Sequence, residues 1–190
     1  LTNRLGPAML IDYARRLGVE SPMPPVISLA LGAADVTLLE LTNAYGVVAA
    51  GGIRSEPFAV LRVTDRWGQV LEEHQPERHE VIDPRSNYLI TSMLESVLSS
   101  GTGIRARNMG FQHPAAGKTG TTDSNFDAWF IGFTRQYVCG VWVGFDEKRQ
   151  MGHYNAASPE THPLSPHVAL PISGGIPSEP FAVPEGVVKV

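Results

Sequence analysis

Apolar residues recur at helical spacing in three stretches of the first hundred residues. The first stretch covers residues 7–17, where Leu10, Ala14 and Leu17 share one face and Gly18 follows as a helix stop. The segment 21–25 contains three prolines, so we expect an extended linker after this helix.

Two more helices are predicted further along the chain. Thr37 and Glu40 have capping-box spacing, which satisfies free N–H groups at a helix start, and the glycines of 51–52 end that helix. Asp83 and Pro84 begin the third helix, whose wide apolar face suggests a central position and ends at Gly101. The residues of this face are Leu89, Ile90, Met93, Leu94, Val97 and Leu98.

Strand-like patterns occupy the remaining ordered part of the chain. The segment 58–63 is rich in strand formers, 65–68 has type I turn residues, and 70–71 is apolar again, which predicts a hairpin. Three later strands with short connections are predicted at 115–122, 127–134 and 137–144. Helices followed by antiparallel strands indicate an α+β domain in which helices pack on a sheet.

The composition changes near residue 150. From Gly152 onward seven prolines interrupt any regular element, so we expect a proline-rich C-terminal tail over 151–190, mostly loop, after a folded part over 1–150.

Length and charge exclude several function classes. The chain has 190 residues, 43% of them hydrophobic and 18% charged, as in one globular domain or part of a larger one. A formal net charge of −4 gives no reason to expect nucleic acid, and no run of about 18 apolar residues predicts a membrane span. The single cysteine, Cys139, lies in an apolar run and is interpreted as a buried small hydrophobe. Because Leu1 is no start methionine, we expect a fragment.

The segment Gly117–Thr122 combines one cation, three hydroxyls and two glycines. A phosphate-binding P-loop would need a glycine at the position of Gln112, whereas the preceding glycine is Gly110. Such a loop must also open a helix, but β-branched residues and a turn follow here. Nucleotide binding is therefore disfavoured.

As a strand, the same segment suits a different chemistry. Alternation puts Lys118 and Gly120 on one face and Thr119 and Thr121 on the other. A lysine can attract a substrate carboxylate, and backbone N–H groups of an edge strand can pair with an extended peptide and stabilise an oxyanion. The segment fits acyl transfer on a peptide with a free carboxylate; an ordinary surface strand is the alternative.

The neighbouring residues favour the first interpretation. Lys118-Thr119-Gly120 is the third motif of serine penicillin-recognising enzymes. The chain resembles class A penicillin-binding proteins, the bifunctional peptidoglycan glycosyltransferase/transpeptidases, from about residue 5 to residue 150. The strings that carry the resemblance are 116–122, 127–133 and 140–144, with further landmarks at 30–32, 43–46, 50–52 and 101–103.

This resemblance implies a serine β-lactamase/penicillin-binding-protein transpeptidase-like fold and an acyl-serine mechanism. A serine attacks the D-Ala-D-Ala end of a stem peptide, and a β-lactam traps the same intermediate. Lys118, Thr119 and Gly120 would be catalytic, Lys118 by electrostatic stabilisation and proton transfer. Thr119, Thr121 and Thr122 would bind substrate, and the N–H of Thr121 would form half of the oxyanion hole. No cofactor or metal is expected, and the location would be the extracytoplasmic face of the bacterial plasma membrane, in the periplasm, with an anchor upstream.

The chain departs from the family at the nucleophile. None of its three lysines, Lys118, Lys148 and Lys189, follows a serine by three residues, so there is no Ser-x-x-Lys motif. The second motif, Ser-x-Asn, would fall just before Leu1. We therefore expect the C-terminal part of a transpeptidase domain, with the missing N-terminal part of the same protein as its partner, and no activity from this part alone.

Two other functions of the same fold stay open: a serine β-lactamase or D,D-carboxypeptidase, and a non-catalytic β-lactam sensor. The strings 128–130 and 141–144 argue against the first.

For several other side chains a functional role is conceivable, but a structural role is preferred. The residues are His153, His162 and His167 as metal ligands, Asp127 and Asp146 as catalytic carboxylates, and Arg105 and Arg107 as a steering patch. Solvent-exposed histidines, carboxylates that flank strands and a solvated basic surface are preferred.

Overall fold

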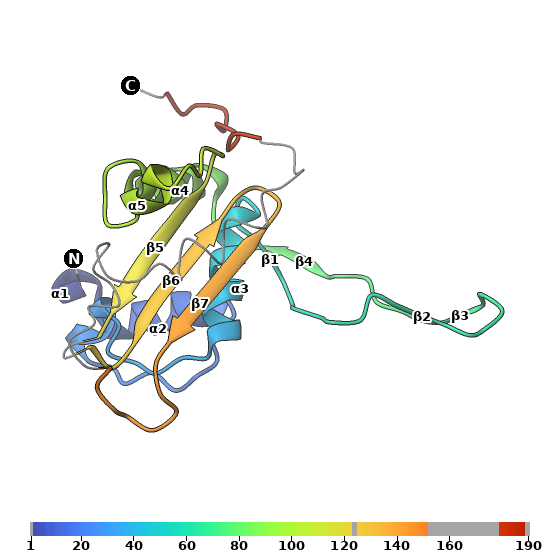
Figure 1. The fold of residues 1–190 in the computed structure, drawn as a ribbon, viewed down its shortest axis with the longest axis horizontal. Helices are drawn as coiled ribbons and strands as arrows, with labels where there is room; N and C mark the ends of the chain where they lie inside the picture. The colour runs from blue at the N-terminus through green and yellow to red at the C-terminus, as the bar shows by residue number, and fades with distance from the viewer. Residues whose placement is uncertain (1, 123–124, 152–178, 189–190) are drawn as a thin grey trace.

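An antiparallel sheet in the order β5-β6-β7 forms the centre of the molecule (Figure 1). The computed structural model describes residues 2–122, 125–151 and 179–188. The three strands are β5 (Ala116–Thr121), β6 (Ala128–Phe133) and β7 (Val138–Val143), each one residue shorter at both ends than predicted. The predicted antiparallel order and the α+β class are confirmed.

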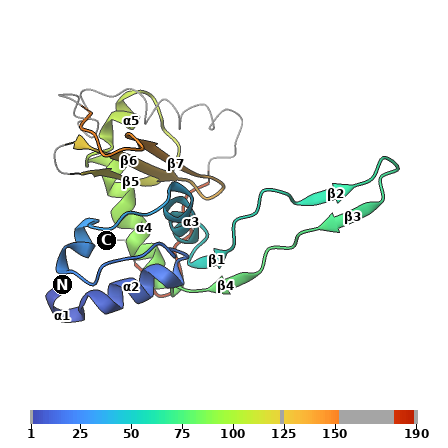
Figure 2. The same cartoon turned by 90° about the horizontal axis from the view of Figure 1, so that it is seen from below.

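In Figure 2 the helices α2 and α3 lie on one side of the sheet, below it in that view. The helix α3 lies against β6 and β7, and α4 lies against β5 and contacts α5. The helical elements are α1 (Thr2–Leu5), α2 (Pro7–Arg16), the 3₁₀ helix η1 (Ile27–Leu31), α3 (Leu38–Ala49), α4 (Pro84–Ser99) and α5 (Ile104–Asn108). The three helices predicted from apolar spacing are confirmed as α2, α3 and α4. Across the described residues, none of the helices combines the length and the apolar character that crossing a bilayer requires.

Two buried clusters hold the helices to the sheet. One joins Val48 of α3 to Ala116 and Phe133 of the sheet. The close approach of α3 depends on Gly140, because a Cβ atom there would lie 2.0 Å from Oγ1 of Thr42. The second cluster lies beneath the C-terminal end of α4 and consists of Leu98, Ala106, Ala115 and Phe130.

The predicted apolar face of α4 is partly wrong. Leu89 and Met93 are 58% and 65% exposed. The packed side instead includes Thr91 and Leu98, with Asn87 donating a 2.9 Å hydrogen bond to the Val48 carbonyl. Residues 87, 91 and 98 recur at helical spacing, which directs positions 89 and 93 to the opposite side. The helix is apolar on two sides, and tertiary packing selects one of them.

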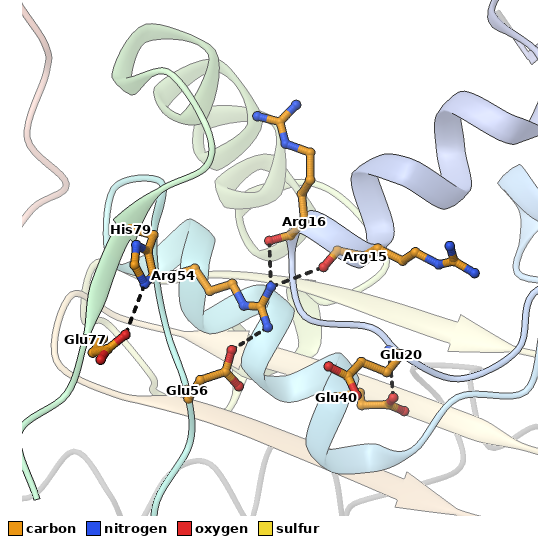
Figure 3. A network of polar contacts seen from close by, with 8 residues as sticks. All are labelled: Arg15, Arg16, Glu20, Glu40, Arg54, Glu56, Glu77 and His79. Carbon is orange, nitrogen blue, oxygen red and sulfur yellow. Dashed lines mark hydrogen bonds and ion pairs between the residues drawn. The ribbon is translucent and has the colours of Figure 1, made fainter.

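The start of α3 is fixed by the predicted capping box. Oγ1 of Thr37 accepts from the Glu40 N–H, and the Glu40 carboxylate accepts from the Thr37 N–H. The same carboxylate accepts from the N–H of Glu20 (Figure 3). It also accepts from the N–H and the hydroxyl of Ser21, at 2.8 and 2.6 Å. These bonds, the Ser21 hydroxyl foremost, lower the pKa of Glu40 to about 2.

Residues 53–81 form a long arm that projects from the body in both views (Figures 1 and 2). Its root pairs β1 (Ile53–Ser55) with β4 (Arg78–Glu80), and its outer part pairs β2 (Arg62–Thr64) with β3 (Val70–Glu73). The outer pair confirms the predicted hairpin, but its first strand begins at Arg62, so the strand predicted over 58–61 is wrong. Every residue of β2 and β3 is exposed.

The root of the arm is tied to the C-terminal end of α2 (Figure 3). The Arg54 guanidinium donates to the carbonyls of Arg15 and Arg16 at 3.2 and 3.4 Å and pairs with Glu56. In return Arg16 donates to the Val81 carbonyl at 2.9 Å. Cationic groups at the carbonyl end of a helix are electrostatically favourable, so α2 and the arm are joined by two mutually supporting contacts.

Gly52 is the tightest backbone position at this root. Its φ is +98°, a region that side chains rarely adopt, and a Cβ atom would lie 2.3 Å from the Ile82 carbonyl oxygen. The Gly52 carbonyl accepts from both Val81 and Ile82.

Replacing Gly52 with alanine should therefore destabilise the fold much more than the same change at Gly51. Gly51 also has a positive φ, of +77°, but nothing lies within 4 Å of its would-be Cβ. Urea unfolding should show a loss of about 1 kcal/mol for Gly51→Ala and about 3 kcal/mol or more for Gly52→Ala, where backbone must also move. Equal losses would contradict the steric argument.

Replacing Glu40 with glutamine should change the pH dependence of stability in the acid range. A folded pKa of about 2, against an ordinary value of 4.5, means that the ionised carboxylate stabilises the fold above pH 4.5. That contribution declines as the pH falls from 4.5 towards 2. Denaturation at a series of pH values should show a higher free energy of unfolding for wild type than for Glu40→Gln near neutrality, and similar values for the two proteins in acid. A difference in free energy that does not change with pH would contradict the assignment.

Candidate active site

The strand β5 runs from the core to the surface along its length. Ala115 and Ala116 are 4% and 0% exposed, and Gly117 is buried. A Cβ atom on Gly117 would lie 2.9 Å from the Ile131 carbonyl oxygen and 3.2 Å from the Phe130 ring. From Lys118 onward the side chains become accessible. The candidate site residues thus extend outward from a rigid start.

One edge of β5 is open within the described part of the chain, because the strand pairs only with β6. The N–H of Thr122 donates to the Asp127 carbonyl at 3.1 Å, so the N–H of residue 122 points towards β6. In an antiparallel pair the N–H groups of alternate residues point to opposite sides. The N–H groups of Thr119 and Thr121 therefore point to the open edge, where an extended ligand could meet them.

Lys118 shares a face of β5 with Gly120, as the alternation predicts. The register pairs Lys118 with Ile131 and Gly120 with Trp129. The ammonium group is exposed and donates to the Thr119 carbonyl at 2.5 Å. Lys118 has no carboxylate partner among the described residues, so its charge is available to an anionic ligand. A Cβ atom on Gly120 would press on Trp129 at 3.3 Å.

The three threonines predicted to bind substrate have different surroundings. Thr119 and Thr121 lie on the other face of β5, and Oγ1 of Thr119 lies 2.6 Å from Oγ1 of Thr102. The Thr121 side chain is exposed and its hydroxyl bonds to no described residue. Thr122 Oγ1 accepts from the Asp127 N–H at 2.8 Å and so closes the turn between β5 and β6. Only the first two hydroxyls lie together on the strand.

Asp127 is held in a structural role, as the sequence interpretation preferred. Its Oδ1 accepts from the indole N–H of Trp142 at 2.9 Å. The ring of Trp142 lies 6.3 Å from that of Trp129 at an angle of 47°. Asp127 therefore ties the β5–β6 turn to β7. Asp146 lies exposed just after β7.

The sequence interpretation missed Thr102. Gly101–Gly103 was noted only as a family landmark, yet its threonine makes a side-chain contact with Thr119. The two residues are 17 positions apart, and no local periodicity joins a turn to a later strand. Only the folded arrangement reveals this pair.

The remaining candidates separate clearly. Arg107 was expected on a solvated surface, but this is wrong, because it is partly buried and donates to the carbonyls of Phe111 and His113 at 2.9 and 2.7 Å. Cys139 is half-buried, and burial raises the pKa of its thiol, which disfavours the reactive thiolate.

Metal ligation finds no support in the parts of the chain that can be described. In residues 2–122, 125–151 and 179–188 there is no group of three or more His, Cys, Asp or Glu side chains suited to a metal ion. The three tail histidines, His153, His162 and His167, lie outside the described residues, as does most of the predicted tail.

Comparison with known proteins gives a consistent family. The family model described as penicillin binding protein transpeptidase domain matches residues 3–158. The chain is 36% identical over 184 residues to penicillin-binding protein 1A of Aquifex aeolicus, covering 97% of this chain and 25% of that protein. It is 33% identical over 206 residues to penicillin-binding protein 1A of Rickettsia prowazekii, covering 96% and 26%. The chain thus spans about a quarter of the length of these curated relatives.

Solved structures agree with this similarity. Penicillin-binding protein 1A from Haemophilus influenzae superposes with a TM-score of 0.85 at 25% identity, covering 98% of this chain and 34% of that one. PonA1 from Mycobacterium tuberculosis, solved in complex with penicillin V, gives a TM-score of 0.71 at 21% identity, covering 96% and 53%. The second likeness concerns the fold alone.

Proposed function

Because the chain belongs to the penicillin-binding protein transpeptidase family, we propose that Gly117–Thr122 forms one wall of a D,D-transpeptidase cleft. The observation that carries the proposal is the position of Lys118-Thr119-Gly120 on the accessible half of an edge strand. The substrate is the D-Ala-D-Ala end of a peptidoglycan stem peptide, and β-lactams occupy the same place. The site works at the extracytoplasmic face of the bacterial plasma membrane, where this substrate is found.

Lys118 supplies the positive charge of the cleft. Its ammonium group is exposed beside the open edge of β5. A preorganised cation stabilises negative charge that develops on an acyl-transfer transition state. It also assists the proton transfer that activates a serine, because a nearby positive charge lowers the free energy of the deprotonated serine oxygen.

Thr119 and Thr121 bind the ligand from the opposite face of the strand. Their hydroxyls are suited to the terminal carboxylate, which accepts hydrogen bonds only. The N–H of Thr121, directed to the open edge, is placed to donate to an oxyanion. Thr122 is the third substrate-binding threonine of the proposal, and its Oγ1 also supports the wall by accepting the turn bond from the Asp127 N–H.

The nucleophile comes from a segment outside this chain. Ser-x-x-Lys does not occur in the 190 residues, whereas acyl-serine chemistry requires an activated serine. This chain therefore contributes electrostatic stabilisation and carboxylate binding, and the other part of the same protein contributes the attacking oxygen.

Labelling with a fluorescent penicillin tests this division of roles. We expect no adduct that survives denaturation on the 190-residue chain. We expect a stable adduct on a longer protein in which this chain follows a segment that carries Ser-x-x-Lys and Ser-x-Asn. Denaturing gel fluorescence is the measurement. A covalent label on the short chain, or none on the longer protein, would overturn the proposal.

In the longer protein, replacing Lys118 with alanine should slow acylation by the penicillin by on the order of 10²-fold or more, because an electrostatic contribution to the transition state is lost. Lys148→Ala is the matched control, since this lysine is exposed after β7 and its ammonium lies 5.3 Å from the Phe126 ring. Stopped-flow measurement of the second-order rate constant should leave the control near wild type. Equal effects of the two changes would argue against a role for Lys118.

A further inference from the structure

We propose that Thr102 is a positioning residue that directs the Thr119 hydroxyl towards the carboxylate of a bound stem peptide or β-lactam. The inference rests on the proposed function and deepens it, because it identifies a side chain outside the Lys118–Thr122 segment that controls carboxylate recognition.

The contact itself is short and exclusive. Oγ1 of Thr102 and Oγ1 of Thr119 are 2.6 Å apart, at the short end of the range for hydroxyl pairs. Neither hydroxyl bonds to any other described residue. Thr102 comes from the turn between α4 and α5, and Thr119 comes from β5. The bond therefore joins two separate elements at the surface of the cleft wall.

The turn that carries Thr102 has little freedom to move. The Gly103 N–H donates to the Val97 carbonyl at 2.9 Å, and the Ile104 N–H donates to the Gly101 carbonyl at 3.1 Å. A Cβ atom on Gly101 or on Gly103 would lie 2.8 Å from atoms of the last turn of α4. The two glycines thus let the turn pack directly on the helix, and the threonine between them is held at a fixed place.

Both partners depend on the same buried cluster. Leu98 and Ala106 flank the turn in sequence and are 2% and 8% exposed. They pack with Ala115, immediately before β5, and with Phe130, which pairs with Thr119 in the register. The separation of the two hydroxyls is therefore set by a packed core, not by two independent surface loops.

Hydrogen-bond chemistry gives the contact a direction when a ligand is bound. A hydroxyl has one proton and two lone pairs, whereas a carboxylate can only accept. If Thr119 donates to the carboxylate, its oxygen can accept from Thr102, and the two bonds polarise one another in a chain. Thr102 thus favours the Thr119 rotamer whose proton points to the ligand. Thr121, which has no described partner, has no such restraint.

The test uses a longer protein in which this chain follows a segment that carries the two serine motifs, with benzylpenicillin and its methyl ester as the two acylating probes. Valine has nearly the volume of threonine but no hydroxyl, whereas serine keeps the hydroxyl. We expect Thr102→Val to lower the second-order acylation rate constant for the free acid by about tenfold, because the hydrogen bond from the Thr119 hydroxyl to the ligand carboxylate becomes weaker. Thr102→Ser should stay near wild type, and the ester rate should change little in either variant.

Two further comparisons make the outcome decisive. The ratio of the acylation rate constants for the acid and for the ester is measured for each variant. A reduced fraction of folded protein lowers both rate constants equally and therefore does not change this ratio. In a Thr119→Val background, Thr102→Val should have no additional effect on the acid, because the residue through which it acts is already gone.

An equal loss for acid and ester, or an undiminished effect of Thr102→Val in the Thr119→Val background, would overturn the inference while leaving the proposed function intact. A wild-type protein that penicillin does not acylate would overturn the proposed function, and the inference with it.

Discussion

The small residues at the start of β5 constrain the rest of the molecule. Ala115, Ala116 and Gly117 are buried where α4 and the sheet meet, and a side chain on Gly117 would collide with β6. Because interiors are close-packed, a larger residue here would push the helix from the sheet. The accessible half of the strand begins at the next residue, Lys118, so the packing of three small residues determines where the charge and the hydroxyls of the site are held.

The parts of the fold that the sequence predicted are those whose signals are local. The capping box of Thr37 and Glu40 lies within one helical turn, and the central strands are continuous runs of strand-forming residues. The pairing of β1 with β4 escaped prediction, since it joins two three-residue strands separated by the whole outer arm. The exposed face of α4 was assigned to the core because apolar residues occur on both sides of that helix, and only its neighbours distinguish them.

The candidate site has the same division. Lys118-Thr119-Gly120 is a contiguous motif and could be identified from sequence, including the opposite directions of its charged and hydroxyl side chains. Thr102 could not, because its partner is brought near only by the packing of α4 against β5 and against α5. The strand presents a cation on one face, hydroxyls on the other and backbone donors along its edge. A ligand lying on that edge can therefore be recognised by three kinds of group without any rearrangement of the strand, which limits the entropic cost of binding.

The arm has a consequence for how the molecule opens. It is a two-stranded ribbon in which every residue of β2 and β3 is exposed. Where it joins the body, the N–H groups of Val81 and Ile82 both donate to the carbonyl of Gly52. A segment with little buried apolar area can separate locally at a free-energy cost far below that of global unfolding. Amide protons of β2 and β3 should therefore exchange with solvent as a rapid local unit, while those that join β5 to β6 exchange only when the buried clusters disperse. The molecule thus contains a loosely stabilised extension and a cooperative body, and the candidate site on β5 belongs to the body.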